Sequence, residues 1–405
     1  MTRDLRRGRW ARELAVFGGL VLLGCEGANA WAQPASSPWP MFQANDRHTG
    51  QSTLHGPQGP SPQIAWTFSS QGHRRHSPSI GPDGTIYLGV ERLPVAAIDP
   101  NNGTVIWTGQ GNAATADRSQ PAVGANGDVY IGARDNDLWS IDAADGTTNW
   151  RFKASFDGDV QTPPLIGPDG AIYAATDALA TGQFYAVWPD GSQKWHARIG
   201  GSPHNVSPAL SPDDATVYIT TGGKTLIALD TDDGTELWRT ETSARATGSR
   251  VPNYSPVVGS NGRIYFAARD GVYGFNPAGG AILWSFKPAQ TKFASAPALS
   301  SGGKLFVGGW SGLVGTFYAL NASDGSVAWQ FTPPGRCQFV NTQAALGVDG
   351  KVYFGCGRIL YALDGADGSV EWQMLFDRTF QSGPVISAAG TLLVGNGSSL
   401  YKITD

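Results

Sequence analysis

The side chains best suited to chemistry are cationic and amide groups that recur at one position of a repeating pattern. Each lies a few residues before a short segment of the form Pro-x-apolar-Gly/Ser, or its Ala344 variant. The group consists of Arg74, His76, Arg118, His204, Asn205, Arg250, Lys292, Arg336 and Arg378, with Tyr254 close to Arg250. If they converge, they would bind an anion such as a carboxylated cofactor, an acidic glycan or an acidic partner. The alternative is that long cationic side chains only solvate one face of the fold. The sequence leaves both interpretations open.

One aromatic residue stands apart from the others. Trp310 falls in a connecting loop, whereas most other tryptophans belong to a regular ladder or to the N-terminal segment. An indole in a loop can stack on a planar or sugar ligand. We therefore add Trp310 to the candidate ligand-binding residues.

Other kinds of chemistry find little support in the sequence. It contains no His/Cys cluster with metal-ligand spacing, no Gly-x-Ser-x-Gly elbow and no phosphate-binding loop. We predict no catalytic residues and no metal site. The net charge of −4, with no basic tail beyond the N-terminal segment, argues against nucleic acid as a partner.

The elements that position these residues can be predicted from eight tryptophans that recur every 41 to 46 residues, which we call the ladder. They are Trp66, Trp107, Trp150, Trp195, Trp238, Trp284, Trp329 and Trp372. A period of this length among short apolar runs and Gly-rich turns is typical of a β-propeller with four strands per blade. The sequence therefore predicts an all-β fold.

A second marker accompanies each tryptophan. The segments that begin at Pro78, Pro121 and Pro164 continue into Asp-Gly or Asn-Gly, the strongest short signal for a hairpin turn. Related anchors stand at Pro208, Pro256, Pro297, Ala344 and Pro384. Each unit is thus strand A, tight turn, strand B, loop, strand C, Asp-containing turn and strand D ending at the tryptophan. The A–B and C–D turns should form an acidic face, with Asp83, Asp169, Asp233, Asp349 and Asp367 as examples.

The number of anchors implies how the ring closes. The last anchor, Pro384, is followed by no strand D, whereas the strand at 63–68 precedes the first anchor. We expect this N-terminal strand to complete the last blade, which leaves no open sheet edge. The prediction is an eight-bladed propeller over residues 62–405, preceded by a pre-ring segment at 31–61.

The first 30 residues are expected to direct export and not to join the fold. Several arginines precede a short apolar run at 14–24, which is too short for a permanent membrane span. Small-x-small cleavage near Ala30 would release a soluble protein, periplasmic or secreted. Alternatively, Leu22-Leu-Gly-Cys25 resembles a bacterial lipobox, which would make Cys25 the lipidated N-terminus of an outer-membrane lipoprotein. Only this lipid anchor would attach the protein to the membrane.

The other two cysteines, Cys337 and Cys356, fall at the same end of the predicted A–B hairpin of the seventh blade. A disulfide between them is plausible in an oxidising compartment. Two free thiols remain the alternative.

The segments Ala97–Trp107 and Ala362–Trp372 fit the pattern Ala-x-Asp-x-x-x-Gly-x-x-x-Trp. This pattern resembles the tryptophan-docking repeat of the pyrroloquinoline quinone (PQQ)-like propeller superfamily, over about 340 residues. Trp39-Pro-Met-Phe42 and His48-Thr-Gly50 look like the segment before the ring in exported members. The resemblance implies an eight-bladed scaffold whose eight ladder tryptophans are packing residues.

Two branches of that superfamily differ in what they imply. Resemblance to the non-catalytic, BamB-like branch implies a monomeric envelope scaffold without a cofactor, which binds an envelope protein or a small anionic ligand or glycan. The alternative is a compact PQQ-dependent alcohol or sugar dehydrogenase that holds PQQ with Ca²⁺. This chain lacks the adjacent cysteines that often form a vicinal disulfide in such enzymes. A second alternative is a propeller acting on an anionic polysaccharide through His204, Tyr254 and neighbouring arginines.

Overall fold

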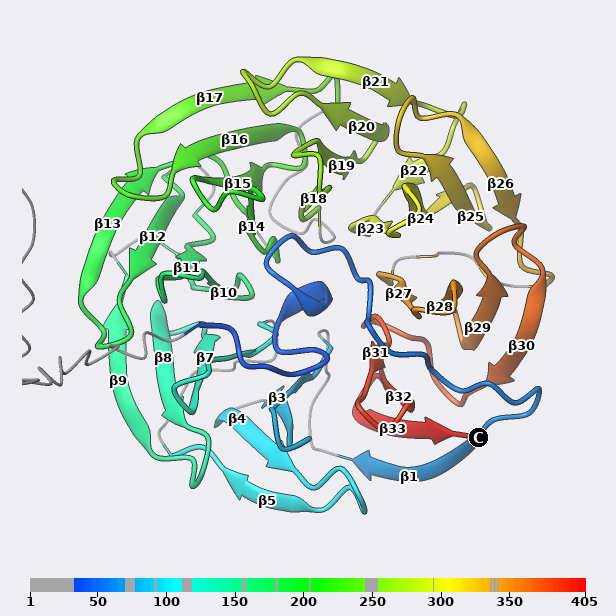
Figure 1. Cartoon of the computed structure of the whole chain (residues 1–405), viewed down its shortest axis with the longest axis horizontal. Helices are drawn as coiled ribbons and strands as arrows, with labels where there is room; N and C mark the ends of the chain where they lie inside the picture. Colours follow the sequence, from blue (N-terminus) through cyan, green and yellow to red (C-terminus); the bar gives the residue numbers. More distant parts are fainter. Residues whose placement is uncertain are drawn as a thin grey trace, which may run out of the picture. The chain divides into compact units, whose positions relative to one another are not determined.

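The computed structural model describes residues 33–69, 77–90, 93–110, 119–154, 158–178, 181–203, 205–244, 254–293, 295–335, 337, 340 and 342–405. These residues form eight antiparallel sheets arranged in a ring (Figure 1). In each sheet strand A is the innermost and strand D the outermost. The prediction of an eight-bladed all-β propeller is confirmed.

Blades are numbered in the order of their strands A. Blade 1 contains β2 (Ser79–Ile80), β3 (Ile86–Val90), β4 (Leu93–Ile98) and β5 (Val105–Thr108). Blade 2 contains β6 (Ala122–Val123), β7 (Asp128–Gly132), β8 (Asp137–Asp142) and β9 (Thr148–Lys153). Blade 3 contains β10 (Leu165–Ile166), β11 (Ile172–Ala175), β12 (Gln183–Val187) and β13 (Gln193–Arg198). Blade 4 contains β14 (Ala209–Leu210), β15 (Thr216–Thr221), β16 (Thr225–Asp230) and β17 (Glu236–Glu241).

The second half of the ring follows the same plan. Blade 5 contains β18 (Val257–Val258), β19 (Ile264–Ala268), β20 (Gly271–Phe275) and β21 (Ile282–Phe286). Blade 6 contains β23 (Ala298–Leu299), β24 (Lys304–Ser311), β25 (Val314–Asn321) and β26 (Val327–Phe331), with an additional strand β22 (Lys292–Phe293). Blade 7 contains β27 (Ala345–Leu346), β28 (Lys351–Cys356), β29 (Ile359–Asp364) and β30 (Val370–Leu375). Blade 8 contains β31 (Val385–Ile386), β32 (Leu392–Asn396), β33 (Ser399–Thr404) and β1 (Gln63–Ser69).

Blade 8 combines the first strand in the sequence, β1, with the last three, β31 to β33. Strand β1 pairs antiparallel with β33 from Gln63 opposite Thr404 to Ser69 opposite Ser399. The predicted closure by the N-terminal strand is therefore confirmed, with β1 one residue longer than the predicted 63–68. Figure 1 shows β1 lying along the outer edge of the last blade.

The burial of the strands follows their distance from the axis. Strands A, B and C are almost entirely buried, because both of their faces pack against neighbouring blades. Strand D alternates between half-buried and exposed residues, as in β9. Its exposed side faces solvent, and its tryptophan turns inward.

Seven of the eight ladder tryptophans join their blade to the next one through the same contact. The indole Nε1 of Trp107 donates a hydrogen bond to the carbonyl of Ala143, at 3.0 Å, in the C–D turn of blade 2. Its ring lies against Gly146, where a Cβ would fall 2.5 Å from the ring. The glycine is also required by its φ of +79°. The same contact pairs Trp66 with Gly103, Trp150 with Gly191, Trp195 with Gly234, Trp238 with Gly280, Trp284 with Gly325, and Trp329 with Gly368.

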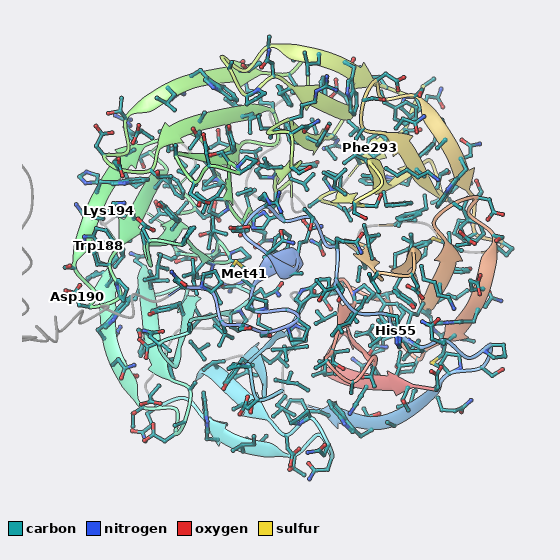
Figure 2. All side chains as sticks on the ribbon, in the orientation of Figure 1. Met41, His55, Trp188, Asp190, Lys194 and Phe293 are labelled. Carbon is teal, nitrogen blue, oxygen red and sulfur yellow. A yellow bond between two sulfur atoms is a disulfide. The ribbon has the colours of Figure 1, made fainter. Side chains whose placement is uncertain are left out.

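Residues 33–56, which we call the strap, lie across the middle of the ring (Figure 1). The strap includes a short 3₁₀ turn, η1 (Phe42–Ala44), and Met41, which is fully buried near the centre (Figure 2). Its carbonyls accept hydrogen bonds from the second residue of strand A in six blades. The pairs are Ile80 with Trp39, Val123 with Pro40, Leu210 with Asp46, Val258 with Arg47, Leu299 with Thr49, and Leu346 with Gly50, at 2.8–2.9 Å.

The strap also reaches the other two blades. Met41 belongs to the core cluster that contains Leu165 and Ile166 of blade 3. His55, labelled in Figure 2, approaches Gly390 of blade 8. The strap thus fastens the inner strands of the whole ring from a single segment. Within the part of the chain that the structure describes, no helix has the length and apolar character needed to cross a membrane.

Candidate functional site

The candidate ligand-binding residues come from the end of the ring that carries the D–A and B–C loops, which we call the loop face. Five of them lie in described parts of the chain: Asn205, Tyr254, Lys292, Trp310 and Arg378. Arg74, His76, Arg118, His204, Arg250 and Arg336 lie outside the described residues, as does Cys25.

Tyr254 is a packing residue in this structure. Its side chain is only 2% exposed, and its hydroxyl donates to the carbonyl of Phe293, at 3.2 Å, in the next blade. Phe293, labelled in Figure 2, is itself fully buried. Burial raises the pKa of Tyr254, so the phenol stays protonated. This residue ties blade 5 to blade 6.

Asn205 and Arg378 lie in loops of blades 4 and 8. Asn205 has a φ of +56°, and its Oδ1 is buried with no hydrogen-bond partner among the described residues. Arg378 is exposed, and its carbonyl accepts a bond from Asn396 Nδ2. The carboxylate of the neighbouring Asp377 accepts bonds from Asn396 and from Tyr401, and these two bonds lower the pKa of Asp377. Asp377, the acidic residue next to Arg378 in the sequence, is thus held in place by hydrogen bonds from blade 8.

Lys292 and Trp310 are brought together by a strand that the sequence did not predict. Lys292 begins β22, which pairs antiparallel with β24 so that Lys292 lies directly opposite Trp310. Residues opposite each other in such a ladder present their side chains on the same face of the sheet. An aromatic and a cationic side chain therefore lie side by side on blade 6.

Beyond Trp310, blade 6 extends into a hairpin longer than those of the other blades. Strands β24 and β25 have eight residues each, and the connection places Leu313 and Val314 at its tip. These side chains are 69% and 52% exposed. We call Lys292, Trp310, Leu313 and Val314 the blade-six hairpin site. The apolar pair Leu313-Val314 after Ser-Gly was the signal for this tip in the sequence, and the sequence prediction missed it.

The base of this hairpin is held by blade 7. The amide of Gly315 donates to the carbonyl of Cys337 at 2.8 Å. Gly315 lies so close to Cys337 that an added Cβ would fall 2.9 Å from its Sγ. A Cβ at Gly308 would likewise clash with Val340. The hairpin therefore rests on the segment that contains Cys337.

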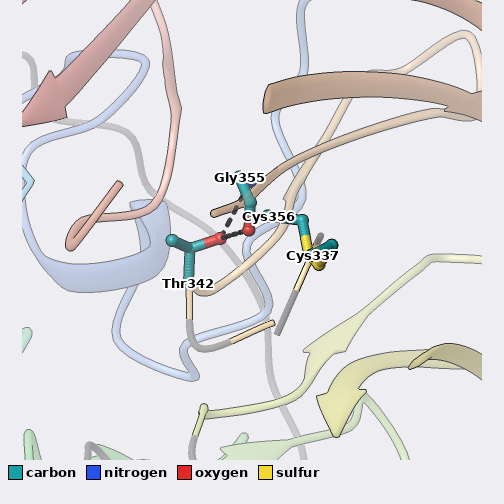
Figure 3. The surroundings of a disulfide bond; sticks show 4 residues. All are labelled: Cys337, Thr342, Gly355 and Cys356. Atoms are coloured by element: carbon teal, nitrogen blue, oxygen red, sulfur yellow. Dashed lines mark hydrogen bonds between the residues drawn. A yellow bond between two sulfur atoms is a disulfide. The ribbon is translucent and has the colours of Figure 1, made fainter. Parts of the chain in front are cut away.

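A disulfide between Cys337 and Cys356 links that segment to strand β28 (Figure 3). Their Cα atoms are 5.5 Å apart, within the ordinary range for a disulfide, and both residues are buried. Next to them, the hydroxyl of Thr342 donates to the carbonyl of Gly355 and accepts from its amide, at 3.0 and 2.9 Å. The loop below the hairpin is thus anchored at two adjacent points.

Other cations of the loop face have partners of their own. Lys224 forms an ion pair with Glu241 at 2.7 Å, and Arg358 Nε donates to the carbonyl of Phe376 at 2.8 Å. These contacts agree with the interpretation that several cations of the loop face interact with neighbouring protein groups and not with a ligand.

Calcium bound with PQQ would require six to eight oxygen ligands. Among the described residues, no group of three or more His, Cys, Asp or Glu side chains is placed to hold a metal ion.

Comparison with known proteins extends this picture. A family model described as outer membrane protein assembly factor BamB matches residues 59–209, 91–272 and 268–402. The serine/threonine-protein kinase AfsK of Streptomyces griseus is 30% identical over 183 residues, 42% of this chain. That match spans only 22% of the kinase, so this chain corresponds to about a fifth of its length.

Solved structures share the fold at low sequence identity. A quinohemoprotein alcohol dehydrogenase from Pseudomonas putida HK5 has a TM-score of 0.74 at 14% identity, covering 91% of this chain and 80% of the enzyme. BamB from Moraxella catarrhalis has a TM-score of 0.62 at 15% identity, covering 85% of this chain and 98% of that protein. At such identities the structures show the fold alone. The family match extends over almost the entire ring, and the chain therefore belongs to the PQQ-like propeller repeat family whose model is described as outer membrane protein assembly factor BamB.

Proposed function

We propose that this protein is a non-catalytic scaffold of the bacterial cell envelope that docks a partner protein through the blade-six hairpin site. The observation that carries the proposal is the pair of exposed apolar side chains, Leu313 and Val314, at the tip of a hairpin braced at its base. Apolar and aromatic anchors surrounded by polar groups are the usual centre of a protein interface.

The support beneath the hairpin favours binding. Strand β22 pairs with β24 on one side, and the segment at Cys337 contacts Gly315 on the other. A surface that is already ordered loses less conformational entropy when a partner binds. A rigid apolar tip is therefore a better docking element than a long mobile loop of the same composition.

Export to the envelope is part of the proposal. It is supported by the arginine-rich N-terminal segment followed by a short apolar run at 14–24, and by the BamB description of the family. The binding partner would present an apolar patch with acidic groups at its edge, complementary to Leu313, Val314 and Lys292.

Site-specific crosslinking tests the docking site. A photoreactive amino acid is placed at Leu313 in the native bacterium, and at Ile106 as a control. Ile106 is 53% exposed on the outer strand β5 of blade 1, similar to Val314. Irradiation should give one dominant adduct with an envelope protein from position 313 and not from position 106.

The adduct partner, once identified and purified, allows the energetics to be measured. Leu313→Asp should weaken its binding by about tenfold or more, since truncating a hot-spot residue costs about 2 kcal/mol. Ile106→Asp should leave the affinity unchanged. Equal effects of the two substitutions, or no adduct at position 313, would refute the proposed docking site.

A further inference from the structure

The opposite end of the ring, which carries the A–B and C–D turns and which we call the turn face, contains a cavity of about 640 Å³. It lies between the strap and the turns of blades 5 and 6. Its lining includes Arg47, Thr49, Arg263, Asn261, Gly302 and Asn321. This volume is in the range of sites that hold small molecules.

The strap presents one side to this cavity and the other to the ring. Odd-numbered strap residues from Asn45 to Thr53 line the cavity. Between them, His48 and Ser52 are buried, and Gly50 packs against Ala344 and Ala298. The alternation arises in an irregular segment, in which His48 and Gly50 have positive φ values of 57° and 65°. One wall of the cavity is therefore a row of polar side chains on a segment fastened to six blades.

Three turn positions at the cavity are neutral where blade 1 has a carboxylate. Asp83 occupies the A–B turn of blade 1, and the matching positions of blades 5 and 6 are Asn261 and Gly302. In the C–D turn, the position of Asp99 in blade 1 corresponds to Asn321 in blade 6. Blades 2 and 8 are also neutral at the A–B position, so the turn face is acidic only in part, and at this cavity two neutral turns lie next to each other.

Turn geometry does not require this neutrality. Asp83 Oδ1 accepts a bond from the amide of Thr85 at 3.0 Å, and Asn261 Oδ1 accepts the same bond from Arg263 at 3.1 Å. An aspartate or an asparagine can therefore form the turn equally well. The neutral residues at these positions leave the cavity lining without a carboxylate.

Two arginines supply positive charge to the same space. Arg47 is half-buried and lines the cavity, and its charge also acts on the carboxylates of Asp46 and Asp214. Arg263 Nη1 donates to the carbonyl of Ser323 at 3.1 Å, which fixes this side chain at the rim. Asp324, in the same turn as Ser323, already accepts bonds from the amide and hydroxyl of Ser326. No aspartate or glutamate is among the lining residues described.

We infer that this cavity binds a small hydroxyl-rich molecule that carries a carboxylate or a phosphate, of the sugar acid or sugar phosphate class. Arginine is the side chain best suited to both oxyanions, because its guanidinium offers several donors in one plane. The threonine, serine and amide side chains can donate to and accept from sugar hydroxyls. The site lies on the face opposite the blade-six hairpin and does not depend on the proposed docking function.

Calorimetric titration of the full-length protein tests this inference with four probes: glucuronate, glucose 6-phosphate, glucose and inorganic phosphate. One or both of the sugar anions should bind saturably, and glucose should bind at least about tenfold more weakly. The preference between glucuronate and glucose 6-phosphate distinguishes a carboxylate ligand from a phosphate ligand. Inorganic phosphate should bind more weakly than the preferred sugar anion, because it lacks the hydroxyls.

Two sets of variants connect binding to the cavity. Asn261→Asp with Gly302→Asp restores the acidic turns of the other blades, and a Cβ at Gly302 would contact only Ser300 Oγ, at 3.9 Å. This variant should weaken sugar-anion binding by about tenfold or more, since two carboxylates would oppose the ligand's charge. Arg47→Gln should weaken it as well and serves if the double variant does not fold. Arg239→Gln, on the outer strand β17 and ion-paired with Glu236, is the matched control.

Two results would overturn the inference. One is the absence of binding by either sugar anion up to about 10 mM, the range where affinity is negligible. The other is equal binding by the wild-type protein and by both Arg47→Gln and the restored-acid variant.

Discussion

His48 shows how a single residue of the strap can connect several blades. Its Nδ1 lies 3.2 Å from the carbonyl of Pro256 and donates to it, which leaves Nε2 without a proton. Nε2 lies 3.2 Å from the hydroxyl of Ser207, which is also 3.0 Å from the carbonyl of Pro163. Burial lowers the pKa of His48 to about 3, opposed by the bond to Pro256. The imidazole is therefore neutral in the folded protein.

This neutrality predicts an acid-sensitive contribution to stability. Below about pH 6.5 the unfolded chain gains a proton on His48 while the folded protein does not, until the pH approaches 3. Because the unfolded state then binds more protons, the free energy of unfolding falls with falling pH, by up to about 1.4 kcal/mol per unit. His48→Gln should remove this part of the pH dependence. The measurement is urea-induced unfolding of both proteins at several pH values between about 7 and 5.

The comparison needs a variant that loses an imidazole elsewhere. His196 is exposed on β13, outside the strap, and His196→Gln serves this purpose. Parallel pH profiles for the wild-type protein and His48→Gln would show that the buried imidazole does not contribute as proposed.

At the scale of the element, the residues of the repeat join neighbouring blades. The Asp of the C–D turn shapes the loop, the Gly of that turn gives a flat surface, and the Trp of the preceding blade covers it. Asp142 Oδ1, for example, accepts a bond from the amide of Ala144 at 2.8 Å, and Gly146 of the same turn lies under Trp107. The spacing within the motif follows from this contact and not from any ligand.

Two glycines with similar backbones allow the contact to be tested. Gly146 and Gly127 have φ values of +79° and +86°, so alanine is strained to a similar extent at each. An added Cβ at Gly127 would meet nothing within 4 Å, whereas at Gly146 it would meet the ring of Trp107. Gly146→Ala should therefore destabilise the protein by about 1–3 kcal/mol more than Gly127→Ala, the usual cost of overpacking. Equal urea midpoints for the two variants would contradict the docking role of the tryptophan.

At the scale of the whole molecule, one tryptophan reveals where the ring is joined. Trp372 is 4% exposed, and its Nε1 has no hydrogen-bond partner in the described structure. The other seven indoles donate to a carbonyl of the next C–D turn, as Trp329 does to Gly365 at 3.1 Å. In blade 8, β33 is the last strand in the sequence and β1 is the first, so no C–D turn connects them. Closure of the ring therefore leaves one indole without its usual acceptor.

The turn face differs in charge from one pair of blades to another. Between blades 3 and 4, a cavity of about 340 Å³ on the turn face is lined by Asp169, Asp214 and Asp232. Lys194 partly neutralises it, 2.7 Å from Asp169 and 4.8 Å from the centre of the Trp188 ring (Figure 2). Between blades 5 and 6 the cavity lining has no carboxylate and includes two arginines. A face expected to be acidic thus carries both signs.

Titration with PQQ and Ca²⁺ tests the alternative activity of the whole molecule. We expect no rise in melting temperature, because the proposed function is a non-catalytic scaffold that holds no cofactor. A cofactor at about 100 times its Kd would stabilise the folded protein by about 2.7 kcal/mol, a shift of several degrees. Scanning fluorimetry with PQQ plus Ca²⁺, and with Ca²⁺ alone, measures it. A saturable, calcium-dependent shift together with dye-linked oxidation of an alcohol or sugar would establish the dehydrogenase instead.

Much of the fold was accessible from the sequence, and the candidate site much less so. The ladder from Trp66 to Trp372 predicted eight blades and the closure by the N-terminal strand, because the blade contacts repeat with the chain. Trp310 was identified as unusual, but β22 and the exposed tip at Leu313 were missed. Strand β22 pairs with residues 16 to 18 positions away without the hairpin signal of the repeat. Tyr254 was a candidate for ligand binding, yet its hydroxyl serves the contact between two blades.

The amino-acid sequence by itself determined the repeat, the number of blades and the strand that closes the ring, since each depends on residues at constant spacing. Only the tertiary structure decided where the strap lies, because its partners are spread over six blades and its φ values are positive at Gln43 and His48. It also decided that Arg47, Arg263 and the neutral turns at Asn261 and Gly302 share one cavity. Such convergence joins residues far apart in the chain, and no local pattern records it.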